Sequence, residues 1–249
     1  MHWPTDVTYR QRLLREDLVS RPRIPTTRPP NRLVRRGIDV AAAAVGLVAL
    51  SPLLLLSALA IGLGSSGGIL FRQVRVGRLG RPFTLLKFRT MTRSSEGRAC
   101  FPPPGEDRTT PFGHWRRRTR LDELPQLWNV LRGDMSLVGP RPEVPDWVDL
   151  EDPRWIEMLS VRPGLTDPAS LAFLDEAELL SASADPEATY RDQILPAKLD
   201  RSVEYLRTRT LHRDLEVLRQ TVVATISRMA IRSSRIGREA PASKTAVRA

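Results

Sequence analysis

An apolar run without a single charged residue, residues 40–63, constrains the fold of this chain more than any other stretch. Its length matches the roughly 20 residues that a membrane-spanning helix needs. Ser51-Pro52 lies near its middle, and a proline at such a position removes a backbone donor and kinks or breaks the helix. The run therefore predicts two helical segments joined by a break.

Basic residues flank this run on both sides: Arg32, Arg35 and Arg36 before it, and Arg72, Arg75, Arg78 and Arg81 after it. Positive charge is normally retained on the cytoplasmic side of a membrane. Both flanks are therefore expected on one side, with a re-entrant hairpin between them. A straight span and a buried core helix are the alternatives. Asp39 is spaced to pair with Arg35 or Arg36 on one helical face.

The charge balance indicates anionic partners. The 249 residues carry a net charge of +11, which favours nucleic acid, anionic lipid or phosphorylated substrates. Cys100 is the only cysteine, so an internal disulfide framework is excluded. Residues 1–30 are rich in arginine and proline and predict a basic, disordered arm, and residues 231–249 predict a basic, disordered tail.

Two strands are expected after the apolar run, at residues 69–76 and 82–91, joined by a turn that carries Gly77 and Gly80. Alternation places Lys87 and Arg89 on one face of the second strand, about 7 Å apart. That spacing can straddle a diphosphate. A solvated strand face is the simpler alternative.

Residues 121–142 contain two adjacent carboxylates at the start of a short amphipathic helix. Pro125 suits a first turn and Gly133 suits a C-terminal cap. Asp122 and Glu123 then lie at the positive end of the helix dipole, which favours ionised carboxylates and attracts phosphate. The expected apolar face of this helix consists of Leu124, Leu127, Trp128 and Leu131. An ordinary capped helix is the alternative.

An arginine-rich segment leads directly into these carboxylates and includes Arg118 and Arg120. Cations beside a carboxylate pair are useful where phosphates must be held near an acid. Farther along, Trp147, Trp155, Ile156 and Leu159 suit short helices in a membrane interface, with core packing as the alternative.

Helices are expected from about residue 187 to 229. Their apolar stripes are Leu199, Val203 and Leu206, followed by Leu211, Leu215, Leu218 and Val222. The fold class predicted overall is α+β and mostly helical. It comprises a re-entrant membrane helix hairpin, a small β-hairpin and interfacial amphipathic helices.

Several motifs occur in a fixed order from about residue 32 to 229: Arg35-Arg36 with Asp39, Ser51-Pro52, residues 71–77, residues 87–91, residues 121–127, residues 133–136, and Gly139-Pro140-Arg141-Pro142. In this order they resemble the monotopic phosphoglycosyl transferases, a family of bacterial sugar transferases. The resemblance divides the chain into a membrane hairpin at 31–68, with Arg36, Asp39, Ser51 and Pro52 as its marker residues, and a cytoplasmic catalytic domain at 69–230.

The resemblance implies an activity and roles for individual residues. Members of the family transfer a phosphosugar from a UDP-sugar to undecaprenyl phosphate, release UMP, and so begin surface polysaccharide or glycoconjugate synthesis. Asp122 matches the nucleophile and a ligand of the required Mg²⁺, and Glu123 matches the second member of the dyad. The substrate-binding positions are expected to be Lys87, Arg89, Arg118, Arg120, Pro140, Arg141 and Pro142.

The resemblance also implies a monotopic protein of the inner membrane, in contact with membrane lipid, with its site facing the cytoplasm. The sequence does not determine whether the protein forms a homodimer. Asp167-Pro168-Ala169-Ser170 departs from the sequence that many members carry at this point, which leaves the sugar undetermined. The alternative functions are a membrane-tethered binder of an anionic polymer and a non-catalytic scaffold. No nucleic-acid partner is expected, because six Phe and three Tyr offer few stacking aromatics.

Overall fold

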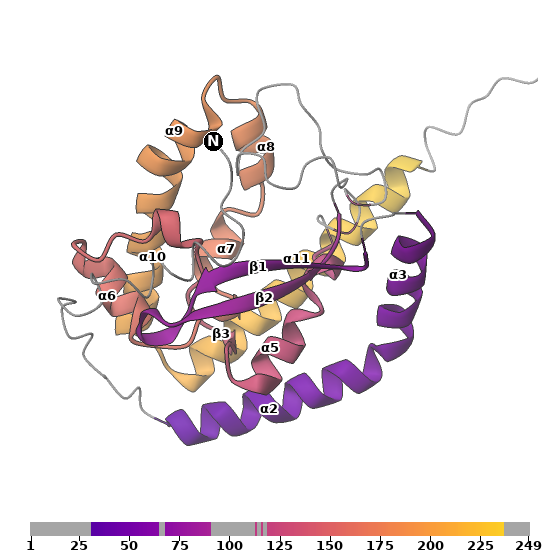
Figure 1. Ribbon diagram of the computed structural model, residues 1–249, viewed down its shortest axis with the longest axis horizontal. Helices are drawn as coiled ribbons and strands as arrows, with labels where there is room; N and C mark the ends of the chain where they lie inside the picture. The colour runs from indigo at the N-terminus through magenta and orange to yellow at the C-terminus, as the bar shows by residue number, and fades with distance from the viewer. Residues whose placement is uncertain (1–30, 65–67, 91–112, 114–115, 117–118, 237–249) are drawn as a thin grey trace, which may run out of the picture.

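The computed structural model describes residues 31–64, 68–90, 113, 116 and 119–236 (Figure 1). Predictions for the arm at 1–30, for Arg118 and for residues 237–249 lie outside this part of the chain. The described residues are mostly helical, with two small two-stranded sheets. The predicted α+β, mostly helical class is therefore confirmed at this level.

The apolar run forms two helices, α2 (Arg32–Ala49) and α3 (Ser51–Gly64), which are bent by 61° at the break between them. The predicted break at Ser51-Pro52 is confirmed, and Ser51 Oγ closes it by donating to Val48 O at 2.7 Å. Among the described residues, no single helix is long and apolar enough to cross a membrane, whereas the bent pair meets that criterion by length and composition. Figure 1 shows α2 and α3 as an arm around one edge of the molecule.

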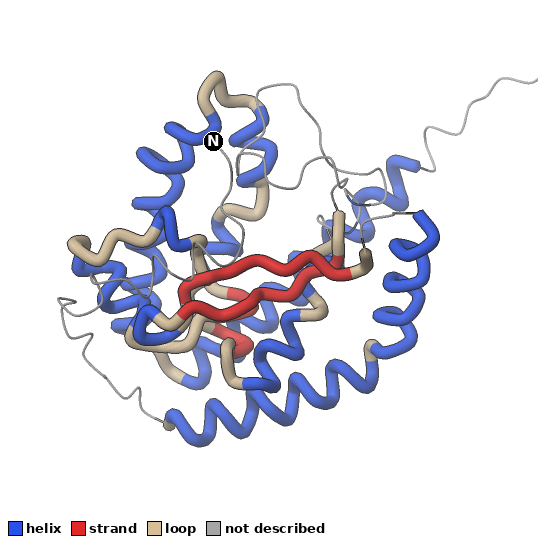
Figure 2. The backbone as a smooth tube through the Cα atoms, viewed as in Figure 1, coloured by secondary structure: helices blue, strands red, loops and turns tan. Residues whose placement is uncertain are grey.

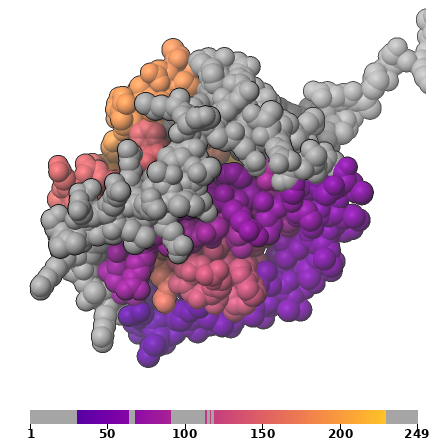
Figure 3. All heavy atoms as spheres, viewed as in Figure 1, coloured from indigo at the N-terminus to yellow at the C-terminus, as the bar shows by residue number. Residues whose placement is uncertain are grey.

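Large apolar side chains on this bent pair face outward. The most exposed are Leu33, Val45, Val48, Leu55, Leu56, Leu59 and Leu63. The opposite face of α2 is polar or small where it meets the rest of the chain, with Arg35, Asp39 and Ala43 buried. In Figure 3 the atoms of α2 and α3, indigo to purple, follow the lower and right margins of the molecule. So contiguous an apolar surface is typical of a contact with membrane or protein.

The predicted β-hairpin is confirmed as β1 (Leu70–Val76) paired antiparallel with β2 (Pro82–Phe88). Its turn contains the 3₁₀ helix η1 (Arg78–Gly80). The second strand ends at Phe88 and not at residue 91 as predicted, because its partner strand begins opposite, at Leu70. Figure 2 shows the hairpin crossing the middle of the molecule.

A second, parallel sheet was not predicted. It pairs β3 (Ser136–Val138) with β4 (Gly164–Thr166). These strands pack with α2, α5 (Gln126–Arg132) and α11 (Leu211–Ile236) around one apolar core. The buried members of this core are Ala43, Leu85, Leu127, Val130, Met135, Leu137, Val138, Tyr205 and Val217.

A second core lies between α6 (Pro153–Leu159) and α10 (Leu195–Arg207). Trp155 is only 2% exposed and Leu159 is also buried. The interfacial assignment of these two residues is therefore wrong, and core packing is their role. The remaining short elements are η3 (Leu121–Glu123), η4 (Pro145–Trp147), α7 (Pro168–Ala172), α8 (Glu176–Ser181), α9 (Pro186–Thr189) and the π-helical η5 (Tyr190–Ile194).

The predicted apolar stripe of α11 is wrong in part. Leu215 and Val222 are 56% and 55% exposed, whereas Asp214 and Val217 are buried. The helix turns Asp214 inward because this carboxylate pairs with Arg35 and Arg209. The helix also continues to Ile236, past the domain boundary expected at residue 230.

Polar contacts fasten α2 to the rest of the fold. Asp39 accepts hydrogen bonds from Ser136 Oγ at 3.1 Å and from the Leu137 backbone N–H at 2.9 Å. Arg36 donates to carbonyl oxygens at the end of α5, and Arg35 pairs with Asp214 of α11. The predicted local interaction of Asp39 with Arg35 is present as well: burial lowers the pKa of Arg35, and the charge of Asp39 opposes that shift.

Candidate active site

The two adjacent carboxylates lie on η3, a single turn placed between an unusual backbone residue and a helix. Arg120, which precedes the turn, has a φ of 54°, in the left-handed region, and α5 begins at Gln126 after Pro125. Asp122 and Glu123 are only 6% and 8% exposed. The predicted position at the entrance to a short helix is confirmed, as is Gly133 as its C-cap, with a φ of 95°.

The helix after the carboxylates buries its predicted apolar face in part: Leu127 is in the core and Leu131 packs against it. Leu127 and Val130 are buried, whereas Trp128 is 49% exposed. Asn129 shares the buried face because its amide bonds to β2, accepting from Leu86 N at 3.1 Å and donating to Thr84 O at 2.8 Å. A buried amide satisfied in this way fixes the distance between α5 and the hairpin.

Glu123 is held by two cations from distant parts of the chain. Its Oε1 lies 2.6 Å from Arg141 Nη2 and 3.3 Å from Lys87 Nζ. Burial acts to raise the pKa of Glu123, but the charges of Arg141 and Lys87 outweigh burial and hold this pKa well below its ordinary value. Glu123 is therefore ionised, and its two ion pairs connect β2 with the loop after β3.

The same contacts act on the cations. The charge of Glu123 raises the pKa of Arg141. Burial lowers the pKa of Lys87, with Glu123 opposing that shift. Sequence reasoning named all three residues, and the structure brings them together.

Two further arginines flank the carboxylates. Arg116 is buried, and burial lowers its pKa while the neighbouring charge of Asp122 raises it. Arg120 Nη2 donates to Ser170 O at 3.3 Å, and its guanidinium interacts with the charge of Glu123. Arg89 follows β2, where its backbone N–H donates to Ile69 O at 3.0 Å, and its role with substrate stays a prediction.

The segment from Gly139 to Pro142 is fixed on both sides. Gly139 N donates to Thr166 O at 3.0 Å, and Pro140 O accepts from Gly164 N at 2.9 Å. On the other side, Pro142 O accepts from Arg75 Nη1 at 3.0 Å. A Cβ on Gly164 would lie 2.1 Å from Gly139 N, so the two backbones approach as only glycine allows. Arg141 is thereby presented to Glu123 from a rigid loop.

A buried pair of carboxylates, ringed by cations from three parts of the chain, suits chemistry on phosphate groups. A model of the bacterial sugar transferase family matches residues 30–228, which is most of the chain. The chain belongs to the bacterial sugar transferase family. The predicted family and the predicted enzyme class are both confirmed.

Several relatives with named activities match large parts of this transferase. The UDP-glucose:undecaprenyl-phosphate glucose-1-phosphate transferase of Caulobacter vibrioides is 39% identical over 214 residues, covering 84% of this chain and 76% of the relative. The UDP-N-acetylgalactosamine-undecaprenyl-phosphate N-acetylgalactosaminephosphotransferase of Aeromonas hydrophila is 44% identical over 142 residues. That match covers 55% of this chain and 34% of the relative. The undecaprenyl-phosphate glucose phosphotransferase of Komagataeibacter xylinus is 51% identical over 115 residues, 45% of this chain and 22% of the relative.

Sequence reasoning missed the role of Asp167 in this sugar transferase. Asp167 is 1% exposed and caps α7 by accepting from Ser170 N at 2.6 Å. Its second oxygen accepts from the Arg141 backbone N–H and from Ser202 Oγ, both at 3.3 Å. An aspartate followed by Pro168 is an N-cap signature and could have been recognised. The contact with Arg141 could not, because it joins segments that are distant in sequence.

The acidic side chains of the sugar transferase determine whether the predicted Mg²⁺ could bind at this site. The described residues contain no group of three or more His, Cys, Asp or Glu side chains that could hold a metal ion. Glu123 contacts Arg141 and Lys87, and Asp122 is the carboxylate predicted to hold the cation. Mg²⁺ is often held by one or two carboxylates together with substrate phosphates and water. The residues fit that mode of binding, in which the protein supplies one carboxylate.

Proposed function

We propose that this sugar transferase moves a phosphosugar from a UDP-sugar to undecaprenyl phosphate and releases UMP, as the first membrane step of a surface glycan. The main structural support for this reaction is the buried Asp122-Glu123 pair, in which Glu123 contacts Lys87 and Arg141. The names of the relatives from Caulobacter, Aeromonas and Komagataeibacter support the same donor and acceptor classes.

Asp122 and Glu123 have different roles in this proposal. Glu123 holds the cations in place, and Asp122 is the nucleophile. An oxygen of Asp122 forms a bond to the phosphorus that carries the sugar, while the bond from that phosphorus to the UMP oxygen breaks. The lipid phosphate then attacks the same phosphorus and releases Asp122. A carboxylate nucleophile divides a difficult transfer into two easier steps, with ping-pong kinetics as the signature.

The cations around the pair counter the charge of the substrates. Two polyanions must meet at this site, and fixed positive groups stabilise the negative charge on the reacting phosphates. Lys87, Arg120 and Arg141 are placed for this role, and Arg141, flanked by Pro140 and Pro142, suits the uridine end. Mg²⁺ held by Asp122 and the diphosphate oxygens would supply further charge neutralisation.

The bent pair α2–α3 is proposed to enter one leaflet of the inner membrane and return, with the catalytic domain in the cytoplasm. Arginines on both flanks and the outward apolar side chains of α2 and α3 support this arrangement. Such an anchor would hold the site near the lipid phosphate and lower the entropic cost of meeting it.

The catalytic proposal is tested by Asp122→Asn, with Asp146→Asn, an exposed carboxylate on η4, as the control. UMP release is measured with a panel of UDP-sugars and undecaprenyl phosphate. We expect Asp122→Asn to abolish UMP release, while membrane association and the activity of the control are retained. Undiminished UMP release by Asp122→Asn would refute the assignment of the nucleophile.

The membrane topology is tested by labelling single cysteines from outside intact cells, in a Cys100→Ser background. Cysteines introduced at Arg10 and at Asp200, one on each side of the apolar run, should both resist an impermeant reagent. Labelling at only one of the two positions would establish a full span.

A further inference from the structure

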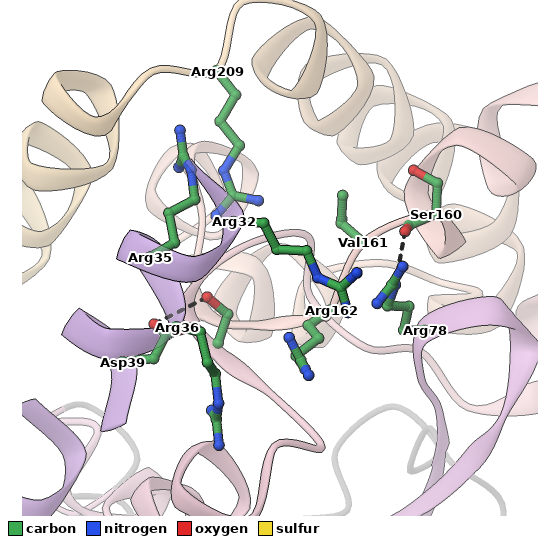
Figure 4. A pocket seen from close by; sticks show the side chains of 10 residues that line it. Arg32, Arg35, Arg36, Asp39, Arg78, Ser160, Val161, Arg162 and Arg209 are labelled. Atoms are coloured by element: carbon green, nitrogen blue, oxygen red, sulfur yellow. Dashed lines mark hydrogen bonds between the residues drawn. The ribbon is translucent and has the colours of Figure 1, made fainter. Parts of the chain in front are cut away.

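A pocket lined by arginines lies where the start of α2 meets the rest of the molecule (Figure 4). Its arginines come from α2, from the hairpin turn, from the loop after α6 and from the segment before α11. They are Arg32, Arg35, Arg36, Arg78, Arg162 and Arg209. The pocket holds about 410 Å³ of space that protein atoms do not fill, part of it open to solvent. Figure 4 shows these side chains around one common space.

Two carboxylates face this cluster, and both already have partners. Asp214 pairs with Arg35 and with Arg209, the latter at 3.2 Å. Asp39 accepts its hydrogen bonds from Ser136 and Leu137 of β3. Six guanidinium groups thus share two carboxylates, and the pocket retains a large excess of positive charge.

Backbone carbonyls fix the guanidinium groups of Arg36, Arg78 and Arg162 without cancelling their charge. Arg36 donates to Val130 O at 2.7 Å and to Leu131 O at 2.9 Å, and Arg162 Nε donates to Gly133 O at 2.8 Å. These bonds cap the C-terminal end of α5, whose partial negative charge offsets only a fraction of two full charges. Arg78 Nε donates to Ser160 O at 3.1 Å.

Electrostatic repulsion within the pocket is evident in its arginines. Burial lowers the pKa of Arg162, and the charges of Arg36 and Arg32 lower it further. Burial also lowers the pKa of Arg78, and the charge of Arg32 adds to that shift. Groups preorganised in this way gain stability when an anion enters.

The pocket is separate from the Asp122-Glu123 pair. Arg78 lies in the hairpin turn before β2, whereas Lys87, which contacts Glu123, lies near the other end of β2. Pro82 and Lys87 are about 17 Å apart along this strand at 3.4 Å per residue. An anion in the pocket therefore does not occupy the position of the transferred phosphate.

The pocket adjoins exposed apolar side chains at the start of α2. Arg32 and Arg36 belong to the same first turns of α2 as the exposed Leu33 and Val34. No acidic residue lies in the first turn of α2, and its N-cap residue Asn31 makes no side-chain capping bond. An anion here would therefore also meet the positive end of an 18-residue helix.

We propose that this arginine pocket is a second anion site, which binds one phosphate group beside the start of α2. The phosphate belongs either to an anionic lipid headgroup or to a free phosphate anion. The site is distinct from the catalytic pair and does not depend on the proposed reaction.

The test uses the full chain and the double variant Arg32→Gln/Arg78→Gln. Arg32 has no hydrogen bond or ion pair within the described residues, and Arg78 has one bond to a carbonyl, so the fold should tolerate both changes. The control Arg72→Gln/Arg201→Gln removes the same charge from exposed positions outside the pocket. Thermal unfolding of all three proteins verifies that they are folded.

Inorganic phosphate is added to each protein in a neutral detergent, at constant ionic strength with chloride. Backbone hydrogen exchange is followed in residues 32–36 and 160–162. We expect phosphate to slow exchange several-fold in the wild type and in the control, and not in the Arg32→Gln/Arg78→Gln variant. Absence of protection in the wild type, or equal protection in all three proteins, would overturn the proposal.

Vesicles of phosphatidylcholine, with and without phosphatidylglycerol, distinguish the two sources of phosphate. For a lipid headgroup, the gain in vesicle affinity on adding phosphatidylglycerol should fall roughly tenfold or more in the pocket variant relative to the control. An equal gain in both variants, together with the protection in detergent, assigns the site to a free phosphate anion. UMP release by the pocket variant is also measured in detergent. Retained release would show that a loss of phosphate binding at the pocket is separate from the proposed catalytic reaction.

Discussion

Arg141 Nη2 lies 2.6 Å from Glu123 Oε1, and this ion pair joins the turn before α5 to the loop after β3. The carboxylate is almost fully buried and the guanidinium is about two-thirds buried. The pair therefore fixes the distance between the turn before α5 and the loop after β3, a contact that the sequence alone does not predict. Lys87 on the same oxygen adds β2 as a third segment.

Arg141→Met should reduce both activity and stability. The variant leaves a buried carboxylate with Lys87 and the more weakly interacting Arg120 as its cations, at a cost of about 2 kcal/mol in the free energy of unfolding. Loss of a guanidinium beside the reacting phosphates should lower kcat/KM for UMP release by roughly 100-fold. Activity close to that of the wild type would show that Arg141 has only a structural role. Arg132→Met, an exposed arginine on α5, is the control.

The ion pair also predicts a dependence of stability on pH. Because the pKa of Glu123 is lower in the folded protein than in the unfolded chain, ionised Glu123 stabilises the fold above the unfolded pKa of about 4.3. This stabilisation is lost as the pH falls below that value toward the folded pKa. Denaturation at a series of pH values should therefore show a steeper acid decline for the wild type than for Glu123→Gln. Glu204→Gln, on an exposed face of α10, should retain the wild-type slope.

Asp167→Asn should separate positioning of Arg141 from folding. Asparagine caps a helix about as well as aspartate, so the bond from Ser170 N can persist. Its amide nitrogen cannot accept the Arg141 backbone N–H. We expect KM for the UDP-sugar to rise roughly tenfold, or about 1.4 kcal/mol, with little change in Tm. Asp152→Asn, which changes the cap of α6, should leave KM unaltered, and an equal rise in both variants would contradict the prediction.

Asn129→Ala should destabilise the junction of α5 and the hairpin. The change leaves the Leu86 N–H and the Thr84 carbonyl without the amide that bonds to both. Leaving such buried groups unsatisfied should cost about 2–4 kcal/mol, measured by chemical denaturation in detergent. Gln220→Ala, at an exposed site on α11, should change the same free energy by less than about 0.5 kcal/mol.

Local features of the fold were predictable because they depend on neighbouring residues. Ser51-Pro52 marked the helix break, Gly133 the end of α5, and Gly77 with Gly80 the hairpin turn. Burial was harder to predict from periodicity. Trp155 could suit a membrane interface or a core, and Leu215 follows the helical period of α11 although Asp214 occupies the buried face.

Contacts between distant segments were beyond sequence reasoning. Asp122, Glu123, Lys87 and Arg141 were named individually, and their chemistry pointed to phosphate, but only the fold brings Lys87 and Arg141 onto one oxygen of Glu123. Asp39 was expected to interact within its own helix, and its hydrogen bonds to β3 were not predicted. The parallel pairing of β3 with β4 joins two three-residue strands, which are too short for a periodic signal.

The helix α2 has one face exposed and apolar and one face bonded to the rest of the fold, so the domain cannot complete its folding without this helix. Its outer side chains suit lipid, while Asp39, Arg36 and Arg35 bond to β3, to α5 and to Asp214 of α11. A domain synthesised without α2 would have unpaired groups at each of these positions, next to the helix that follows Asp122 and Glu123. If α2 enters the membrane as proposed, membrane entry and completion of these contacts are coupled, because the same helix makes both. A soluble form made by deleting residues 31–68 would be incompletely folded, and not merely unanchored.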